Sequence, residues 1–118
     1  MKKVSKKIVE TDLSKIEAYK LVNSNSTVGA KEVIGQPFKL NGYAICDVQI
    51  IEETGEVSEM KSLSLATSIG NIGTSSESSI SSLLDMIELF KEELNDFELV
   101  FTTAKAKSGN LFVDLEIA

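Results

Sequence analysis

The segment Ser79–Asn95, SISSLLDMIELFKEELN, carries the clearest helical pattern in the sequence. Its large apolar residues recur at spacings of three and four, which places them on one stripe of an α-helix, and charged residues fill much of the remaining surface. Ser78 or Ser79 is suited to cap the first turn, and Asn95 to end the helix. We therefore predict an amphipathic helix that packs on a sheet. The apolar stripe consists of Ile80, Leu83, Leu84, Ile87, Phe90 and Leu94.

Five segments around this helix show the alternation of apolar and polar residues that is typical of strands. Three precede the helix and two follow it. Residues 53–56 and 107–110 have the composition of tight hairpin turns. The third segment is the poorest in strand-forming residues. The five segments are 38–53, 60–69, 71–78, 97–105 and 111–117.

This order of elements predicts a mainly β fold with one or two helices, in the form of a five-stranded OB-fold-like barrel with a helix between strands three and four. We assign residues 32–118 to the barrel and residues 1–31 to a partly mobile N-terminal appendage. Within the appendage, residues 11–22 fit a short helix or an extra strand. Residues 1–7 fit either a solvated tail or a flexible lysine arm that reaches phosphate.

Composition excludes several kinds of site. The chain of 118 residues has no histidine and one cysteine, so it lacks the usual general base, the commonest zinc ligand and any internal disulfide. All 12 basic side chains are lysines. The sequence shows no signal peptide, no long apolar run, no glycine-rich phosphate loop and no metal-ligand cluster. We expect a cytoplasmic protein without cofactor, metal or membrane contact that is not an enzyme, and a buried thiol at Cys46.

Charge is distributed unevenly along the chain. Residues 1–40 hold eight lysines and four acidic residues, a net charge of +4, whereas residues 41–118 hold four lysines and fourteen acidic residues, a net charge of −10. The total is −6. A dipolar chain of this kind can bind an anion on one face despite its acidic balance.

Two aromatic residues stand out on the strand pattern. In the first predicted strand, alternation directs Phe38 and Leu40 toward the core together with every second residue up to Ile50, so Tyr43 is expected to point outward. Phe112 has the outward parity in the last strand. Exposed rings can stack on bases, and nearby lysines can follow a phosphate backbone. The alternatives are that the appendage covers the rings and that the lysines protect strand edges. The candidate site residues are Lys39, Tyr43, Lys61, Lys105, Lys107 and Phe112.

Four segments together resemble the small single-stranded DNA-binding proteins of phages and mobile elements of Gram-positive bacteria. These segments are GQPFKLNGYAICDVQIIEETGEV, SLSLATS, SISSLLDMIELF and FELVFTTAKAKSGNLFVDLEI. The resemblance covers roughly residues 33–117 and rests on the order and spacing of the elements. It implies coating of displaced single strands during replication or recombination, without sequence preference and often as an oligomer.

Within this resemblance, the positions carried over are Tyr43, Lys105, Lys107 and Phe112. The chain departs from the family in having only two lysines in the last hairpin and no arginine. We expect single-stranded DNA as the main ligand, replication or recombination proteins as further partners, and a location in the host cytoplasm for a phage-encoded protein. The alternative is a non-catalytic protein–protein adaptor or structural phage protein, in which the outward rings anchor an interface.

Overall fold

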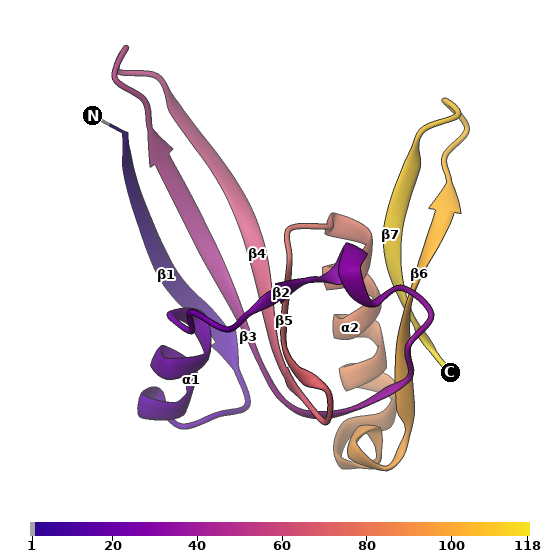
Figure 1. Ribbon diagram of the computed structural model, residues 1–118. Helices are drawn as coiled ribbons and strands as arrows, with labels where there is room; N and C mark the ends of the chain where they lie inside the picture. The colour runs from indigo at the N-terminus through magenta and orange to yellow at the C-terminus, as the bar shows by residue number, and fades with distance from the viewer. Residues whose placement is uncertain (1) are drawn as a thin grey trace.

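The computed structural model describes residues 2–118 and consists mainly of β-strands with two α-helices, as the sequence predicted (Figure 1). It has seven strands rather than the predicted five, and helix α2 follows the fifth strand rather than the third. The strands are β1 (Lys3–Thr11), β2 (Val28–Gly29), β3 (Phe38–Ile51), β4 (Val57–Thr67), β5 (Gly70–Thr74), β6 (Glu98–Lys105) and β7 (Leu111–Ile117). The helices are α1 (Lys15–Val22), the short 3₁₀ helix η1 (Ala30–Val33), α2 (Glu77–Phe90) and the 3₁₀ helix η2 (Lys91–Asp96).

Strand β3 organises the sheet. One edge of β3 pairs with β4 almost throughout, and its other edge pairs first with β6 and then with β1. The strand order is β2-β5-β4-β3-β6-β7, and the sheet curls so that two arms rise on either side of α2 (Figure 1). We call residues 3–8, 46–51 and 57–62 the three-stranded arm, and residues 102–114 the hairpin arm. The arms extend the sheet beyond the part that α2 covers.

The two predicted hairpin turns are confirmed. Between β3 and β4, the Glu52 N–H donates to the Glu56 carbonyl over 2.8 Å and the Gly55 N–H donates to the Glu52 carbonyl over 3.0 Å. Gly55 and Gly109, which lies between β6 and β7, have φ angles of 87° and 90°. A side chain would be strained there, because L-residues rarely adopt positive φ. The first turn places Ile51 opposite Val57 and so determines the register of the arm.

The hydrophobic core lies between the concave face of the sheet and helix α2. The helix begins two or three residues earlier than predicted, because its N-cap is Ser76 and not Ser78 or Ser79. The Ser76 hydroxyl accepts the Ser79 N–H over 3.2 Å and donates to the Val113 carbonyl, so the cap also attaches α2 to β7. The largest fully buried core side chains are Phe38, Phe101, Ile45, Leu63, Leu65, Ile72, Leu83, Leu99 and Leu115.

A β-bulge in β3 makes the predicted alternation wrong beyond Leu40. Leu40 pairs with Thr67 and Gly42 with Ala66, so Asn41 is an extra residue without an opposite partner. An extra residue reverses the two faces of the strand. Tyr43 therefore points into the core, where it is 6% exposed, and not outward as predicted.

The N-terminal segment is part of the sheet. Residues 3–7, which we expected to be a tail or a flexible arm, belong to β1, which pairs with β3 from Lys3 opposite Ile51 to Thr11 opposite Ala44. Helix α1 packs against β3 and β4, and it resolves the choice between helix and strand in favour of a helix. Its buried residues Ala18 and Leu21 lie outside the main core, on the side of the sheet that α2 leaves uncovered.

Candidate functional site

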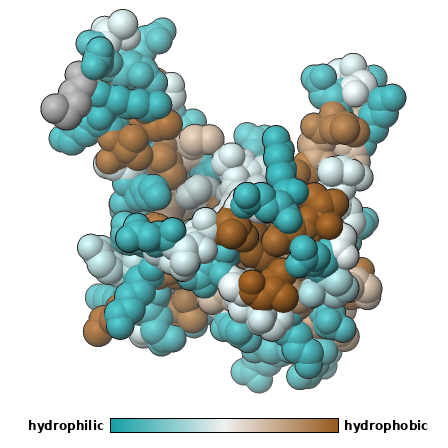
Figure 2. All heavy atoms as spheres, viewed as in Figure 1, coloured by the Kyte–Doolittle hydropathy of each residue, from teal (hydrophilic) through white to brown (hydrophobic). Residues whose placement is uncertain are grey.

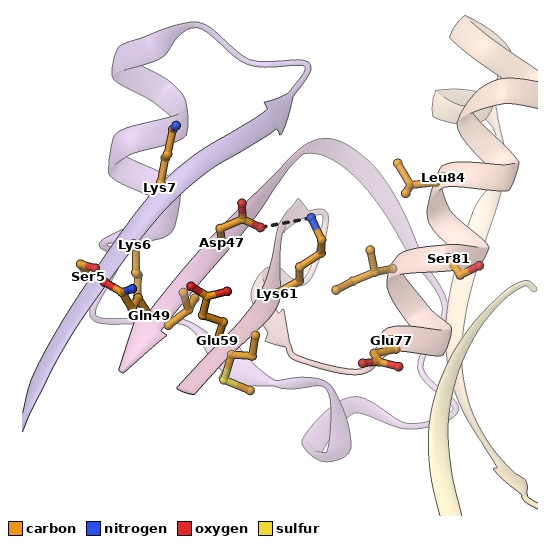
Figure 3. A pocket seen from close by; sticks show the side chains of 13 residues that line it. Ser5, Lys6, Lys7, Asp47, Gln49, Glu59, Lys61, Glu77, Ser81 and Leu84 are labelled. Carbon is orange, nitrogen blue, oxygen red and sulfur yellow. Dashed lines mark hydrogen bonds and ion pairs between the residues drawn. The ribbon is translucent and has the colours of Figure 1, made fainter. Parts of the chain in front are cut away.

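An open groove of about 950 Å³ lies between the three-stranded arm and the first half of α2 (Figure 3). Its floor is the face of β1, β3 and β4 that continues the core face beyond the last apolar layer. The change from core to groove follows the sequence, because Ile45 and Leu63 form the last apolar pair before charged residues begin. The lining residues are Ser5, Lys6, Lys7, Asp47, Val48, Gln49, Glu59, Met60, Lys61, Glu77, Ile80, Ser81 and Leu84.

A charged row crosses the floor of this groove. Lys7 of β1 and Lys61 of β4 are the register partners of Asp47, which lies between them on β3. The Lys61 ammonium is 3.1 Å from Asp47 Oδ1, and the two side chains are 58% and 55% exposed. Within residues 2–118 no ion pair is found for Lys7. The row therefore presents one paired and one unpaired ammonium group to the open side of the sheet.

Carboxylates balance these lysines. The next row on the same face, two residues closer to the turn between β3 and β4, contains Ser5, Gln49 and Glu59. Glu77 faces the floor from the first turn of α2 (Figure 3). Lys6 also borders the groove, but strand alternation directs its side chain to the other face of β1. The groove is therefore mixed in charge, not strongly basic.

The wall opposite the floor is partly apolar. Ile80 is buried at the edge of the core and Leu84 is half-buried beside it, one helical turn further along α2. Ser81 is exposed on the same wall. Figure 2 shows apolar side chains gathered in the middle of the viewed face, between the arms, whereas the arm tips are hydrophilic. An extended ligand in the groove would contact ammonium groups on one side and methyl groups on the other.

The two predicted stacking rings do not share this groove. Tyr43 is in the core, where burial raises the pKa of its hydroxyl, with smaller contributions from the charges of Glu10 and Asp12. Phe112 is half-buried and lines a different cavity of about 600 Å³, which is bordered by Ala30 and Ser76 among others. The prediction that both rings form one exposed surface is wrong, because the bulge turns Tyr43 inward.

The predicted lysines divide into three groups. Lys61 lies in the groove. Lys39 precedes the bulge and has the parity opposite to the core residues Phe38 and Leu40, so it lies on the outer face. Lys105 shares the core-facing parity of Phe101 at the end of the hairpin arm, and Lys107 belongs to the turn that follows. The hairpin lysines do not line the groove.

The sequence did not place Lys7 or Asp47 among the candidate site residues, although one alternative for residues 1–7 was a flexible lysine arm that reaches phosphate. The sequence predicts the hairpin turn around Thr54. Counting outward from this turn pairs Asp47 with Lys61, so the contact between them could have been predicted from the sequence. The position of Lys7 could not have been predicted in this way, because lysine-rich strands are uncommon and residues 3–7 have no apolar alternation. The missing step was the pairing of β1 with β3.

Other kinds of site find no support in the part of the chain that the structure describes. Residues 2–118 contain no group of three or more acidic or cysteine side chains placed to hold a metal ion. Cys46 is buried, as predicted, and burial raises the pKa of its thiol. No helix among the described residues is long and apolar enough to span a membrane. Comparison with known protein families, curated proteins and solved structures finds no match.

Proposed function

We propose that the protein is a non-catalytic, sequence-independent single-stranded DNA-binding protein, and that the strand lies in the groove between the three-stranded arm and α2. The charged row of Lys7, Asp47 and Lys61 carries this proposal, because it places cations from two distant parts of the chain on the open face of a curled sheet. Cations that track a backbone are the common element of such sites.

An OB-fold-like interpretation of residues 32–118 supports the proposal. Strands β3, β4 and β5, helix α2, and strands β6 and β7 follow one another in the order expected for that fold. Strand β3 pairs with both β4 and β6, as the long first strand of such a barrel would. OB-folds bind oligonucleotides through the face of their second and third strands and through the loops between strands one and two and between strands four and five. In this order β4 is the second strand and contributes Lys61 to the groove, and the loop between strands four and five is the turn of the hairpin arm. The cellular setting that fits is DNA replication or recombination of a phage or mobile element in the cytoplasm.

The proposed binding mode differs from the one that the sequence suggested. Phosphates contact Lys7 and Lys61 in the groove, and Lys105 and Lys107 of the hairpin arm hold a neighbouring part of the strand. Bases lie against Ile80 and Leu84 instead of stacking on Tyr43. Ring stacking contributes about 1–3 kcal/mol per base at sites that have it. We therefore expect modest affinity with little base preference.

A salt titration tests the proposal. Binding of a fluorescein-labelled oligothymidylate of about 20 nucleotides is measured by anisotropy at several salt concentrations. With three to four effective lysine contacts and a slope of about −0.7 per contact for single strands, log affinity should fall with log salt at a slope of about −2 to −3. Absence of binding at low salt and micromolar protein would contradict the proposal.

A second candidate function is that of a non-catalytic adaptor that binds another protein. It is favoured by exposed apolar side chains away from the groove: Ile16 and Tyr19 on α1 are 69% and 66% exposed, and Leu89 on α2 is 73% exposed. Exposed aromatic and aliphatic residues are common anchors of interfaces. Replacement Tyr19→Ser distinguishes the two functions. It leaves oligonucleotide affinity unchanged under the first and weakens a protein complex under the second.

A further inference from the structure

We propose that Asp47 competes with the nucleic-acid backbone for Lys61 and thereby sets the affinity and salt dependence of the groove. This inference rests on the proposed function and concerns the regulation of the same site. It begins from the position of Asp47, which is flanked by Lys7 on one strand and by Lys61 on the other.

The contact with Lys61 is specific. A single distance of 3.1 Å joins Lys61 Nζ to Asp47 Oδ1, and the geometry also satisfies a hydrogen bond. Both side chains are more than half exposed, so a phosphate can reach the ammonium group without any rearrangement of the core. Because exposed ion pairs contribute little to stability, their partners can be exchanged at low cost.

Binding of a phosphate to Lys61 therefore replaces one anion by another. In the free protein the Asp47 carboxylate already neutralises much of the Lys61 charge, so fewer counterions are released when the strand binds. The carboxylate also remains close to the incoming phosphate and repels it. Both effects weaken binding, and both disappear when Asp47 is made neutral.

Glu59 provides a matched comparison. It lies on the same face of the arm, one row from Asp47, and lines the same groove. Within residues 2–118 no ion pair is found for Glu59. Removing its charge changes the net charge of the groove by the same amount as removing that of Asp47, but it frees no lysine.

The experiment compares Asp47→Asn with Glu59→Gln, using the labelled oligothymidylate. We expect Asp47→Asn to tighten binding about two- to fivefold at low salt, the range in which exposed charge pairs act. It should also make the salt slope steeper by about 0.7, the contribution of one added phosphate contact. Glu59→Gln should tighten binding less and leave the slope unchanged.

Lys61→Gln completes a double-mutant cycle. It should weaken binding less than twofold in the natural chain, where Asp47 neutralises the lysine, and about two- to fivefold in the Asp47→Asn background. Equal effects of Asp47→Asn and Glu59→Gln would overturn the inference in favour of a general charge effect. Unchanged affinity of Asp47→Asn, with the natural chain binding normally, overturns the inference alone. If none of the proteins binds, the proposed function and this inference fall together.

Discussion

The side chain of Leu13 packs directly against Gly42, in the space that a Cβ atom at position 42 would occupy. Leu13 Cγ would lie 2.9 Å from such a Cβ, which is closer than real contacts allow. The contact joins the residues before α1 to the middle of β3, next to the bulge. Two hydrogen bonds reinforce it: the Tyr43 N–H donates to Asp12 over 2.8 Å, and the Thr11 hydroxyl donates to the Tyr43 carbonyl over 2.6 Å.

Replacement of Gly42 by alanine should therefore destabilise the protein. The added methyl group forces Leu13 and the segment before α1 to shift, and overpacking of this kind costs about 1–3 kcal/mol. Chemical denaturation measures the change in the free energy of unfolding. Gly29→Ala is the control, because Gly29 has an ordinary φ of −75° and nothing lies within 4 Å of its added Cβ. A Gly42→Ala protein as stable as the control would contradict this packing.

A second prediction separates a core role of Tyr43 from a stacking role. Tyr43→Leu keeps an apolar side chain in the core but removes the ring and leaves a small cavity, so it should cost about 1–3 kcal/mol of stability. Oligonucleotide affinity should be unchanged, as measured by anisotropy on protein shown to be folded by circular dichroism. Loss of binding with the fold intact would instead assign Tyr43 to the ligand surface.

The fold around Gly42 and Tyr43 also shows which features the sequence predicts correctly and which it does not. The strands from Phe38 onward, helix α2 and both hairpin turns follow from local patterns, because alternation, helical spacing and turn composition depend on neighbouring residues. The bulge at Asn41 is different. It depends on how β3 bends across the sheet, and a single added residue reversed the predicted orientation of Tyr43.

The site was predicted less well than the fold. Lys61 was among the candidate residues and lies in the groove, but its partner Asp47 was not among them, and Lys7 belonged to a segment expected to be a solvated tail or a flexible lysine arm. Strand β1 forms because β3 offers it a long unpaired edge, a tertiary effect that no property of residues 3–7 reveals. The burial of Tyr43 and the separation of Phe112 from the groove likewise depend on how distant strands pair in the sheet, which local sequence patterns do not specify.

Lys7, the groove lysine without an ion pair among the described residues, should differ from lysines elsewhere in its effect on binding. Lys7→Gln should weaken oligothymidylate binding and reduce the salt slope by about 0.7, since it removes one phosphate contact. Lys39→Gln removes the same charge from the outer face of β3 and should leave the slope unchanged. Equal changes in both variants would indicate that only the net charge matters.

Ser76, the N-cap of α2, should contribute more to stability than the exposed Ser81 within the helix. Its hydroxyl caps the helix and also bonds to Val113, so Ser76→Ala should lower the free energy of unfolding by about 1–2 kcal/mol. Ser81→Ala changes an exposed helical position and should have an effect within about 0.5 kcal/mol. Thermal or urea denaturation of both variants measures the difference, and equal stabilities would contradict a capping role for Ser76.

Alkaline conditions should destabilise the fold through Cys46 and Tyr43. Burial raises the pKa of both groups, so the folded state holds their protons more tightly than the unfolded state. The Cys46 contribution is complete below its ordinary pKa of 9.0 and is lost as the pH rises toward the folded value. In Cys46→Ala, the fall in unfolding free energy between about pH 8 and pH 10 should be smaller, as followed by urea denaturation. If the unfolding free energy of Cys46→Ala falls by the same amount as that of the natural chain, the Cys46 thiol does not cause the alkaline destabilisation.

The lysines of β1 have a consequence that does not depend on any ligand. Among the described residues β1 pairs only with β3, so its second backbone edge is open to another chain. Lys3, Lys6 and Lys7 surround that edge with like charges, which hinder the docking of an identical strand from a second molecule. The cationic edge should therefore hinder concentrated protein from adding strand to strand into aggregates, and acetylation of these amines should weaken that protection.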